Sequence, residues 1–186
     1  QKDIISSTLN GIKGALDYTQ ALNTIILDNS GITELKIYDK IPFSINLRVE
    51  ALGSQFSGDE GNINLQAVLN NITKIPFELE DKGTIEHENL KIGLEVPTLE
   101  EENELLSRCQ EEINTESNKL KDNIGTLYLL EIAKYIESLQ IDDDVINMSK
   151  IRISERIQLI EKLPLAVYTD ISKFIQTIDN YELKIL

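Results

Sequence analysis

The chain of 186 residues is poor in the residue types that build many catalytic and metal sites. Its one cysteine, Cys109, excludes an intrachain disulfide framework and every zinc site that takes several cysteines from one chain. Its one histidine, His87, likewise excludes a metal site with two histidines from one chain. Tryptophan is absent, and the aromatic residues are six tyrosines and four phenylalanines. A cleft lined with aromatic side chains is therefore not expected.

Basic residues are also scarce, with 18 lysines and arginines against 32 acidic residues and a net charge of −14. Neutralising the phosphates of a nucleic acid requires a patch of lysine and arginine. The longest basic cluster is Lys150 and Arg152, with Arg156 one turn further on. We therefore expect no nucleic-acid partner and no binding to an anionic membrane.

Long hydrophobic runs are missing as well. Charged residues interrupt every apolar segment before it reaches the roughly 20 residues that a membrane-spanning helix needs. The first residues, Gln1 to Asp3, contain neither a methionine nor the start of an apolar signal sequence. Hydrophobic residues still make up 41% of the chain, which is enough to fill a core. We expect a soluble protein in a cytosolic setting.

The apolar pattern changes near Pro97, from mostly period two before it to period 3.6 after it. This change predicts an α+β fold, with a small antiparallel strand-containing N-terminal part followed by a C-terminal bundle of about four helices. The predicted domains are an N-terminal helical arm (1–33), a small β-containing domain (34–96) and a helical bundle domain (97–186).

Several segments before Pro97 alternate between apolar and polar residues, which is typical of strands. The clearest alternation covers residues 43–49, and similar runs cover 75–79 and 90–96, with turn residues at 81–83 and a possible sheet start at Leu35 and Ile37. Residues 65–72 instead show helical spacing with Asn64 as the N-cap. Residues 1–30 also carry a helical stripe, although Gly11 and Gly14 weaken it.

After Pro97 the signals favour helices. Thr98 and Glu101 form a capping box, followed by a stripe of Leu99, Leu105, Leu106, Cys109 and Ile113. A second helix is predicted from Leu120 to Leu139 and ends at an acidic helix–helix connector, residues 142–144. A third begins near Ser149 with Ile153, Ile157 and Ile160 inward, and the fourth opens at Pro164 and buries Val167, Ile171, Phe174, Ile175 and Ile178.

Five features could carry chemistry, and each has a structural interpretation that we favour. The glycine-rich segment 57–61, with Gly53 nearby, lacks the lysine of a phosphate-binding loop and is interpreted as a mobile surface loop. Residues 142–144 lack the glycine and glutamate that a calcium loop needs.

His87 is interpreted as exposed on a strand, with Glu86 and Glu88 on the opposite face, and Cys109 as an inert core thiol. Paired carboxylates, such as Glu111 with Glu112 and Glu100 with Glu104, reflect the abundance of acidic residues. We therefore expect no catalytic residues, no cofactor and no bound metal.

The wide aliphatic stripes remain. They either form the protein's own core, which we favour, or leave part of the surface, above all the N-terminal helix, to dock onto another subunit.

Four stretches of sequence carry a resemblance to a known family. They are LEVPTLE at 94–100, residues 128–139 leading to Ile141 and Asp142, IEKLP at 160–164, and residues 167–181. In these the chain resembles the baseplate hub assembly proteins of T-even-type contractile-tailed bacteriophages, over residues 41–186 and most clearly over 94–186. Residues 1–40 show no counterpart.

The resemblance implies a non-enzymatic structural or assembly role in a contractile-tail baseplate, with no catalytic residues to carry over. The expected partners are other tail or baseplate proteins in a hetero-oligomeric assembly. The expected location is the virion tail baseplate, or the host cytoplasm during assembly. One alternative is an acidic helical adaptor or regulatory module unrelated to phage, and an enzyme whose site forms across subunits comes third.

Overall fold

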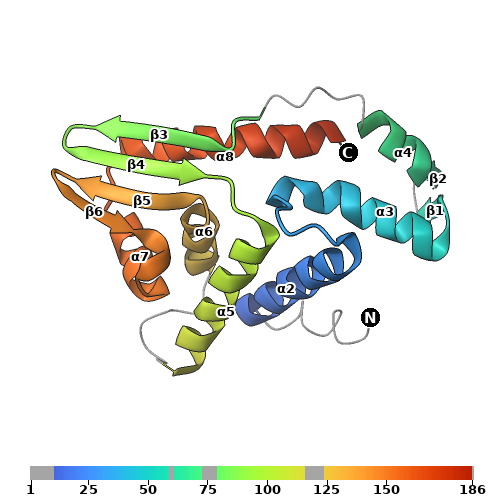
Figure 1. Ribbon diagram of the computed structural model, residues 1–186, viewed down its shortest axis with the longest axis horizontal. Coiled ribbons are helices and arrows are strands. Elements are labelled where there is room, and N and C mark those ends of the chain that lie inside the picture. Colours follow the sequence, from blue (N-terminus) through green and yellow to red (C-terminus); the bar gives the residue numbers. More distant parts are fainter. Residues whose placement is uncertain (1–10, 59–60, 73–78, 116–123, 186) are drawn as a thin grey trace.

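The computed structural model describes residues 11–58, 61–72, 79–115 and 124–185 (Figure 1). These residues form seven α-helices, two 3-10 helices and six strands. In chain order they are α2 (Gly11–Ser30), η1 (Ile37–Asp39), α3 (Lys40–Leu52), β1 (Gln55–Gly58), β2 (Gly61–Asn64), α4 (Leu65–Ile72), β3 (Lys82–His87), β4 (Leu90–Glu95), α5 (Leu99–Thr115), α6 (Ile124–Ala133), β5 (Ile136–Ile141), β6 (Asp144–Asn147), η2 (Met148–Lys150), α7 (Ile153–Glu161) and α8 (Leu165–Ile185).

The larger sheet of the described residues has four antiparallel strands in the order β3-β4-β5-β6 and lies toward one end of the molecule (Figure 1). Helix α8 runs behind β3 and β4, and α6 and α7 lie beside β5 and β6 (Figure 1). Ile92, Leu139, Met148, Ile160 and Ile171 are completely or almost completely buried between the sheet and these helices. Strand β4 lies before Pro97 and its neighbour β5 after it, so the sheet joins residues from both sides of that position.

The prediction of a mixed fold with small antiparallel sheets is confirmed, but the predicted order, with strands first and helices after them, is matched only in part. In the described part of the chain three α-helices precede the large sheet, and two of its strands lie after Pro97, where a pure helical bundle was expected. The division into parts at 33/34 and 96/97 stays a prediction.

The predicted second helix covers two different elements. Its described first part is α6, but the segment from Ile136 to Ile141 is strand β5. The pairing of β4 with β5 shifts register at Gly93 and Leu94, so that Ile136 and Leu139 are both buried although they are three positions apart. A β-bulge thus gives a strand the spacing of a helix. A Cβ on Gly93 would lie 2.5 Å from Oγ of Ser138, so a side chain at this position would force the Ser138 hydroxyl to move.

The strand predicted over residues 43–49 is wrong, because these residues lie in helix α3. Phe43 and Leu47, one helical turn apart, pack against a buried cluster, while no residue of α3 is fully buried. The local signals for a helix were present. Pro42 falls in the first turn, where its missing N–H costs nothing, and Gly53 ends the helix at φ 84° with its N–H bonded to the Val49 carbonyl.

Two smaller expectations near the sheet also fail. Leu35 and Ile37 start no strand, since Lys36 makes only an isolated bridge to Thr98 and a 3-10 helix follows. The turn predicted at residues 81–83 overlaps the start of β3, and the hairpin turns instead at Glu88 and Asn89. The strand predicted over 75–79 falls largely outside the described residues.

The remaining helix and strand predictions are confirmed within the described residues. Helix α2 covers 11–30, and β4 follows the alternation that begins at Leu90. Asn64 caps α4, accepting hydrogen bonds from the N–H groups of Gln66 and Ala67 at 3.0 and 3.3 Å. Thr98 and Glu101 form the reciprocal capping box of α5, at 3.1 and 2.7 Å. Helices α7 and α8 bury the isoleucines expected to face inward, apart from Ile175, which is partly buried.

Two further buried clusters connect the sheet to the N-terminal helices. One joins α2, α5, α6 and α7 through Leu16, Leu105, Leu106, Cys109, Leu130, Ile153 and Ile157. The other joins α2, the end of β4 and α8 through residues that include Ile26, Val96, Leu99 and Ile178. With 21 residues, α8 is about 30 Å long and reaches from the sheet to α3 and α4.

Candidate interaction surface

The two residue types most often used in catalysis lie apart and serve the fold. Cys109 is fully buried on the inner stripe of α5, as expected. Burial, together with nearby Glu112, raises the pKa of its thiol to about 12, which makes it unreactive. His87 lies on β3 as expected but is half-buried, on the face that Gly83 presents to Phe174 of α8. The expectation of a solvent-exposed histidine is thus corrected by the helix that covers this face.

The two loop candidates are hairpin turns. The acidic segment 142–144 was predicted to connect two helices, but Asp142 and Asp143 connect β5 to β6, and Asp144 is the first residue of β6. Asp142 has φ 53° and hydrogen-bonds to the neighbouring β3–β4 turn at Asn89. The glycine-rich segment was expected to be a mobile surface loop, but its described residues belong to the β1–β2 hairpin. Residues 59–60 of this segment lie outside the described part of the chain. Within the described ranges, no three histidine, cysteine, aspartate or glutamate side chains come together as metal ligands.

The paired carboxylates do not line a common cleft. Glu100 and Glu104 are exposed on α5. Glu112 instead binds the start of α7, accepting hydrogen bonds from the N–H groups of Ile153 and Ser154 at 2.5 and 2.9 Å. One helical turn earlier, Arg108 donates to the carbonyls of Ser149, at 2.5 Å, and Ile151. Helix α5 thereby binds the carbonyl groups of the segment that leads into α7 and the free N–H groups of the first turn of α7.

A buried charge network ties four helices together around Glu102, whose side chain is 5% exposed. Its carboxylate forms ion pairs with Lys40 of α3 and, at 3.4 Å, with Lys134 at the end of α6. Asn23 of α2, also fully buried, donates to Glu102 at 2.8 Å and to Asn103 at 2.9 Å. Removing Glu102 takes away the buried counter-charge of Lys40 and Lys134, which is strongly destabilising.

The pKa values follow from this balance of burial and charge. Burial raises the pKa of Glu102, but Lys134 and Lys40 outweigh it and hold the pKa below its ordinary value of 4.5. For Lys134, burial is outweighed by Glu131 and other negative groups, so its pKa is raised. For Lys40 burial prevails, and its pKa is lowered. Glu102 and Lys134 are therefore charged at neutral pH, and their ion pair links α5 to the end of α6.

A second buried charge supports α7. Arg156 is 6% exposed, and its guanidinium donates to the carbonyls of Ala133 and, at 2.7 Å, Ile136, the residues between which α6 gives way to β5. Burial and the nearby Arg108 lower its pKa to about 10, so it stays charged at neutral pH. Arg156 therefore satisfies carbonyls that the end of α6 leaves free.

Sequence reasoning missed both buried charges, although a signal for each exists. Glu102 lies three residues after Leu99 and four before Leu106, and Arg156 lies three after Ile153 and four before Ile160. Both positions thus fall on the inward stripes of their helices. A charged residue at such a position indicates a buried ion pair or a bond to the backbone.

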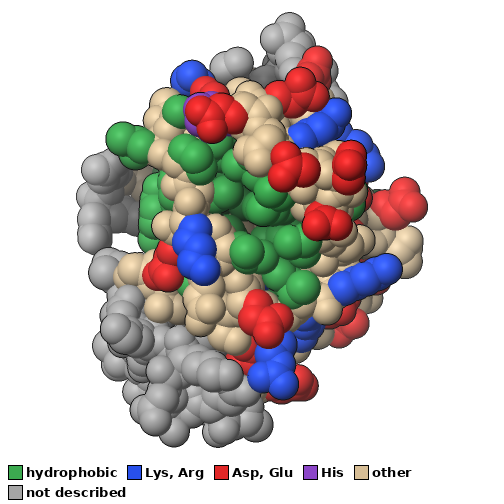
Figure 2. Space-filling view, turned by 90° about the vertical axis from the view of Figure 1, so that its left-hand side faces the viewer, with side chains coloured by type: hydrophobic (Ala, Val, Ile, Leu, Met, Phe, Trp, Pro, Cys, Tyr) green, Lys and Arg blue, Asp and Glu red, His purple; other side chains and the backbone are tan. Residues whose placement is uncertain are grey.

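Hydrophobic side chains are exposed at both ends of the molecule. At the end where the hairpins turn, the sheet–helix core opens to solvent, and Figure 2 shows hydrophobic side chains gathered there, with charged residues around them. We call this surface the sheet-end patch, defined as Leu90, Ile141, Ile146, Leu163 and Leu165. Leu90, Ile146 and Leu163 pack against the core in part, while Ile141 is 42% and Leu165 82% exposed.

The opposite end carries the β1–β2 hairpin with α3 and α4 (Figure 1). Phe56 and Ile63 face each other across the hairpin and are 43% and 47% exposed, and Leu52 before it is 66% exposed. We call these three residues the hairpin-end patch. An isolated two-stranded hairpin is marginally stable by itself.

The structure thus defines a class of protein: a mixed helix and sheet domain whose buried charges tie helices together and which exposes apolar side chains at each of its two ends. The sequence matches the family model described as T4 bacteriophage base plate protein over residues 17–185. The chain therefore belongs to the T4 bacteriophage base plate protein family. No curated protein and no solved structure gives a significant match.

Membership confirms the resemblance at the level of the family and supports a structural role in a phage baseplate, with a location in the virion tail. The match begins at residue 17, so the family includes most of α2, whereas the resemblance found in the sequence began at residue 41. None of the helices in the described ranges is long and apolar enough to cross a membrane.

Proposed function

We propose that this protein is a non-enzymatic structural or assembly component of a contractile-tail baseplate, in its hub or wedge region. It works by binding other tail or baseplate proteins. The observation that carries the proposal is the family match over residues 17–185, which covers nearly all of the described chain.

The use of the buried ionisable groups supports a non-enzymatic role. Glu102, Lys134 and Arg156 each bind a group of this chain and so hold elements together. Cys109 and His87, the residues that could act as nucleophile and base, lie on different elements, α5 and β3, and the thiol is held protonated. Chemistry that needs a free, activated side chain has no support in this arrangement.

Sedimentation of a lysate from infected cells tests the proposal. Each fraction is analysed by mass spectrometry for this chain and for tail proteins. A fixed stoichiometry in mature tail particles indicates a retained subunit, and co-migration with tail proteins only in light fractions indicates an assembly chaperone. If the chain never travels with tail proteins, the proposal fails and the acidic adaptor becomes the better explanation.

A screen for hydrolase and transferase activity tests the non-enzymatic part separately. We expect no turnover above that of a mock purification. Turnover that persists through a second purification and co-elutes with the protein would contradict this part and leave the baseplate location intact.

A further inference from the structure

Strand β6 is an edge strand of the four-stranded sheet. It pairs with β5 on one side, and the sheet order ends with it. Asp144, Val145 and Asn147 are exposed, and Val145 has 65% of its surface accessible. An exposed edge of this kind is a ready template for another extended chain.

The register of the hairpin determines which backbone groups are available. Two residues, Asp142 and Asp143, connect β5 to β6, so the flanking pair Ile141 and Asp144 is hydrogen-bonded. The N–H and C=O groups of Val145 and Asn147 then point away from β5. Val145 thus offers a donor and an acceptor to an incoming strand, and Asn147 offers a donor, because the Asn147 carbonyl belongs to the start of the 3-10 helix η2.

The other edge of the sheet lacks these features. Strand β3 carries Lys82 and Glu86, which form ion pairs with Glu95 and Lys91 on β4 at 3.1 and 3.0 Å. Charged side chains on an edge strand discourage pairing. Helix α8 also contacts β3, where Phe174 lies against Gly83. Strand β6 combines its open edge with the largely exposed Val145 and with a neighbouring apolar surface at Ile146.

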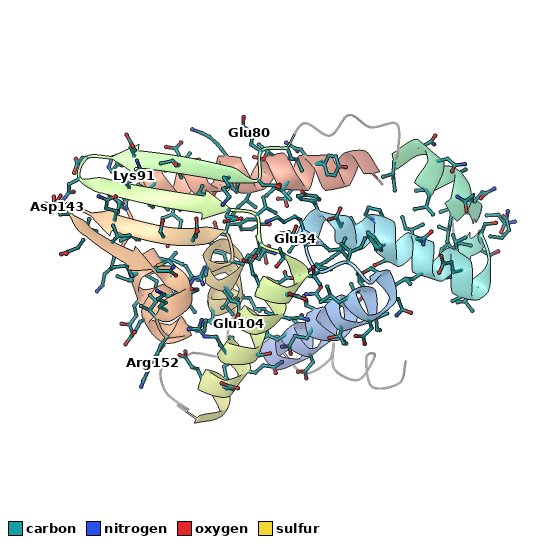
Figure 3. The ribbon with its side chains drawn as sticks, in the orientation of Figure 1. Glu34, Glu80, Lys91, Glu104, Asp143 and Arg152 are labelled. Atoms are coloured by element: carbon teal, nitrogen blue, oxygen red, sulfur yellow. The ribbon has the colours of Figure 1, made fainter. Side chains whose placement is uncertain are left out.

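The surroundings of β6 define the chemistry of its partner. The sheet-end patch begins on β6 itself, at Ile146, and continues to Leu163 and Leu165 (Figure 2). Asp143 and Asp144 are exposed at the start of the strand, and Figure 3 shows Asp143 at the tip of the hairpin. Beside this tip lies a shallow cavity of about 440 Å³ whose charged lining is four carboxylates and one lysine: Glu86, Glu88, Asp142, Asp143 and Lys91.

We propose that β6 receives an extended segment of another baseplate protein, which adds a fifth strand to the sheet. The segment carries apolar side chains that cover the sheet-end patch and at least one lysine or arginine beside the acidic tip. Backbone hydrogen bonds to Val145 and Asn147 supply affinity, and the apolar and basic side chains supply specificity. This inference rests on the proposed function and names its contact surface.

Substitutions at Val145 test the pairing with little risk to the fold, since the side chain is largely exposed. Val145→Pro removes the outward N–H without removing a bond to β5, and Val145→Lys puts a charge on the edge. Val145→Thr keeps both the backbone donor and the β-branched shape. Leu52→Lys, at the hairpin-end patch, is the matched control for adding a charge to an exposed apolar position.

The experiment supplies wild-type and variant chains with distinguishable mass tags together during infection and measures their ratio in the tail-containing fractions. Circular dichroism melting of each purified variant first establishes that it is folded. We expect at least a tenfold loss of Val145→Pro and Val145→Lys from these fractions, and ratios near one for Val145→Thr and Leu52→Lys. Asp143→Lys should lose about threefold, because a rim charge contributes less than the strand pairing.

The outcomes separate this inference from the proposed function. If wild type enters the tail fractions and Val145→Pro and Val145→Lys enter within twofold of it, the edge is not the contact and only this inference fails. If wild type itself is absent from every tail-containing fraction, the proposed function fails and this inference with it. A purified chain that dimerises in analytical ultracentrifugation, with Val145→Lys monomeric, would show that the occupant is a second copy and overturn the partner proposed here.

Discussion

The sheet region and the hairpin end bury their apolar residues to very different extents. The sheet region, residues 82–95 and 136–171, contains isoleucines and leucines with no more than a few per cent exposure, enclosed between strands and helices. The hairpin end, residues 40–72, contains a similar kind of apolar sequence, but Ile72 alone among its described residues is buried. Most of its hydrophobic side chains are half-buried or exposed.

This difference indicates how the two regions are held. Burial of whole side chains stabilises the sheet region directly, at about 25 cal/mol per Å² of apolar surface. The hairpin end depends on its attachment through α3, where Lys40 binds Glu102 and Phe43 packs against the cluster shared with α8. Stability should therefore fall steeply for changes in the sheet region and much less for changes at the hairpin end.

The largest effect is expected for Ile171→Asp, since Ile171 is completely buried where α8 meets the sheet. An unpaired carboxylate there should lower the free energy of unfolding by at least about 4 kcal/mol and unfold the sheet region. Ile175→Asp, at a partly buried position, should be less severe. Thermal melting followed by circular dichroism measures both, and Gln176→Asp at an exposed position of α8 is the control. Unchanged melting of Ile171→Asp would contradict the packing described here.

Glu102→Gln should remove the ion pairs through which Lys40 attaches the hairpin end and Lys134 attaches the end of α6. Lys40 and Lys134 would lose their buried counter-charge, at a cost of about 3 kcal/mol. Chemical denaturation measures the loss, with Glu100→Gln on the exposed face of α5 as the control. Equal stability of the two variants would mean that the network does not contribute.

The pH dependence gives an independent test of Glu102. Its folded pKa lies below its ordinary value of 4.5, so its contribution is complete above that pH and is lost as the pH falls through the folded pKa. The gap in melting temperature between wild type and Glu102→Gln should therefore be constant from neutral pH down to about 5 and close in more acidic solution. A gap that widens on acidification would contradict the direction of the pKa shift.

Removing an N-cap side chain makes the same kind of change in α5 and, at the hairpin end, in α4. Thr98→Ala removes the capping box of α5, and Asn64→Ala removes the cap of α4, each at about 1 kcal/mol of helix stability. Because α5 is part of two buried clusters, Thr98→Ala should lower the global melting temperature. Asn64→Ala should leave that temperature nearly unchanged and speed hydrogen exchange within α4. A global effect of equal size from both caps would mean that the hairpin end unfolds together with the sheet region.

The smallest effect is expected for Phe56→Ser in the hairpin-end patch. The side chain is 43% exposed, so the free energy of unfolding should change by no more than about 0.5 kcal/mol. Urea titration of the variant measures this, with Phe174→Ser, whose ring packs against the core of the sheet region, as the contrasting change. A large loss from Phe56→Ser would show that the hairpin is an integral part of the core.

The sequence determined the features whose signals lie within one or two helical turns. The capping box at Thr98, the cap at Asn64, the buried stripe around Cys109 and the alternation of β4 each depend on neighbouring residues, and each was predicted correctly. Four short stretches of sequence likewise resemble the phage baseplate family, and the family match confirms that membership.

Tertiary structure decided the features that depend on residues distant in the chain. Segment 136–141 is a strand because β4 offers it a free edge and a bulge at Gly93 turns both Ile136 and Leu139 inward. Segment 43–49 alternates like a strand but has no strand to pair with, and as a helix it places Phe43 and Leu47 on the shared cluster. The charge network at Glu102 and the open edge at β6 arise in the same way, because ion pairs between helices and the order of strands in a sheet are fixed only when distant segments meet.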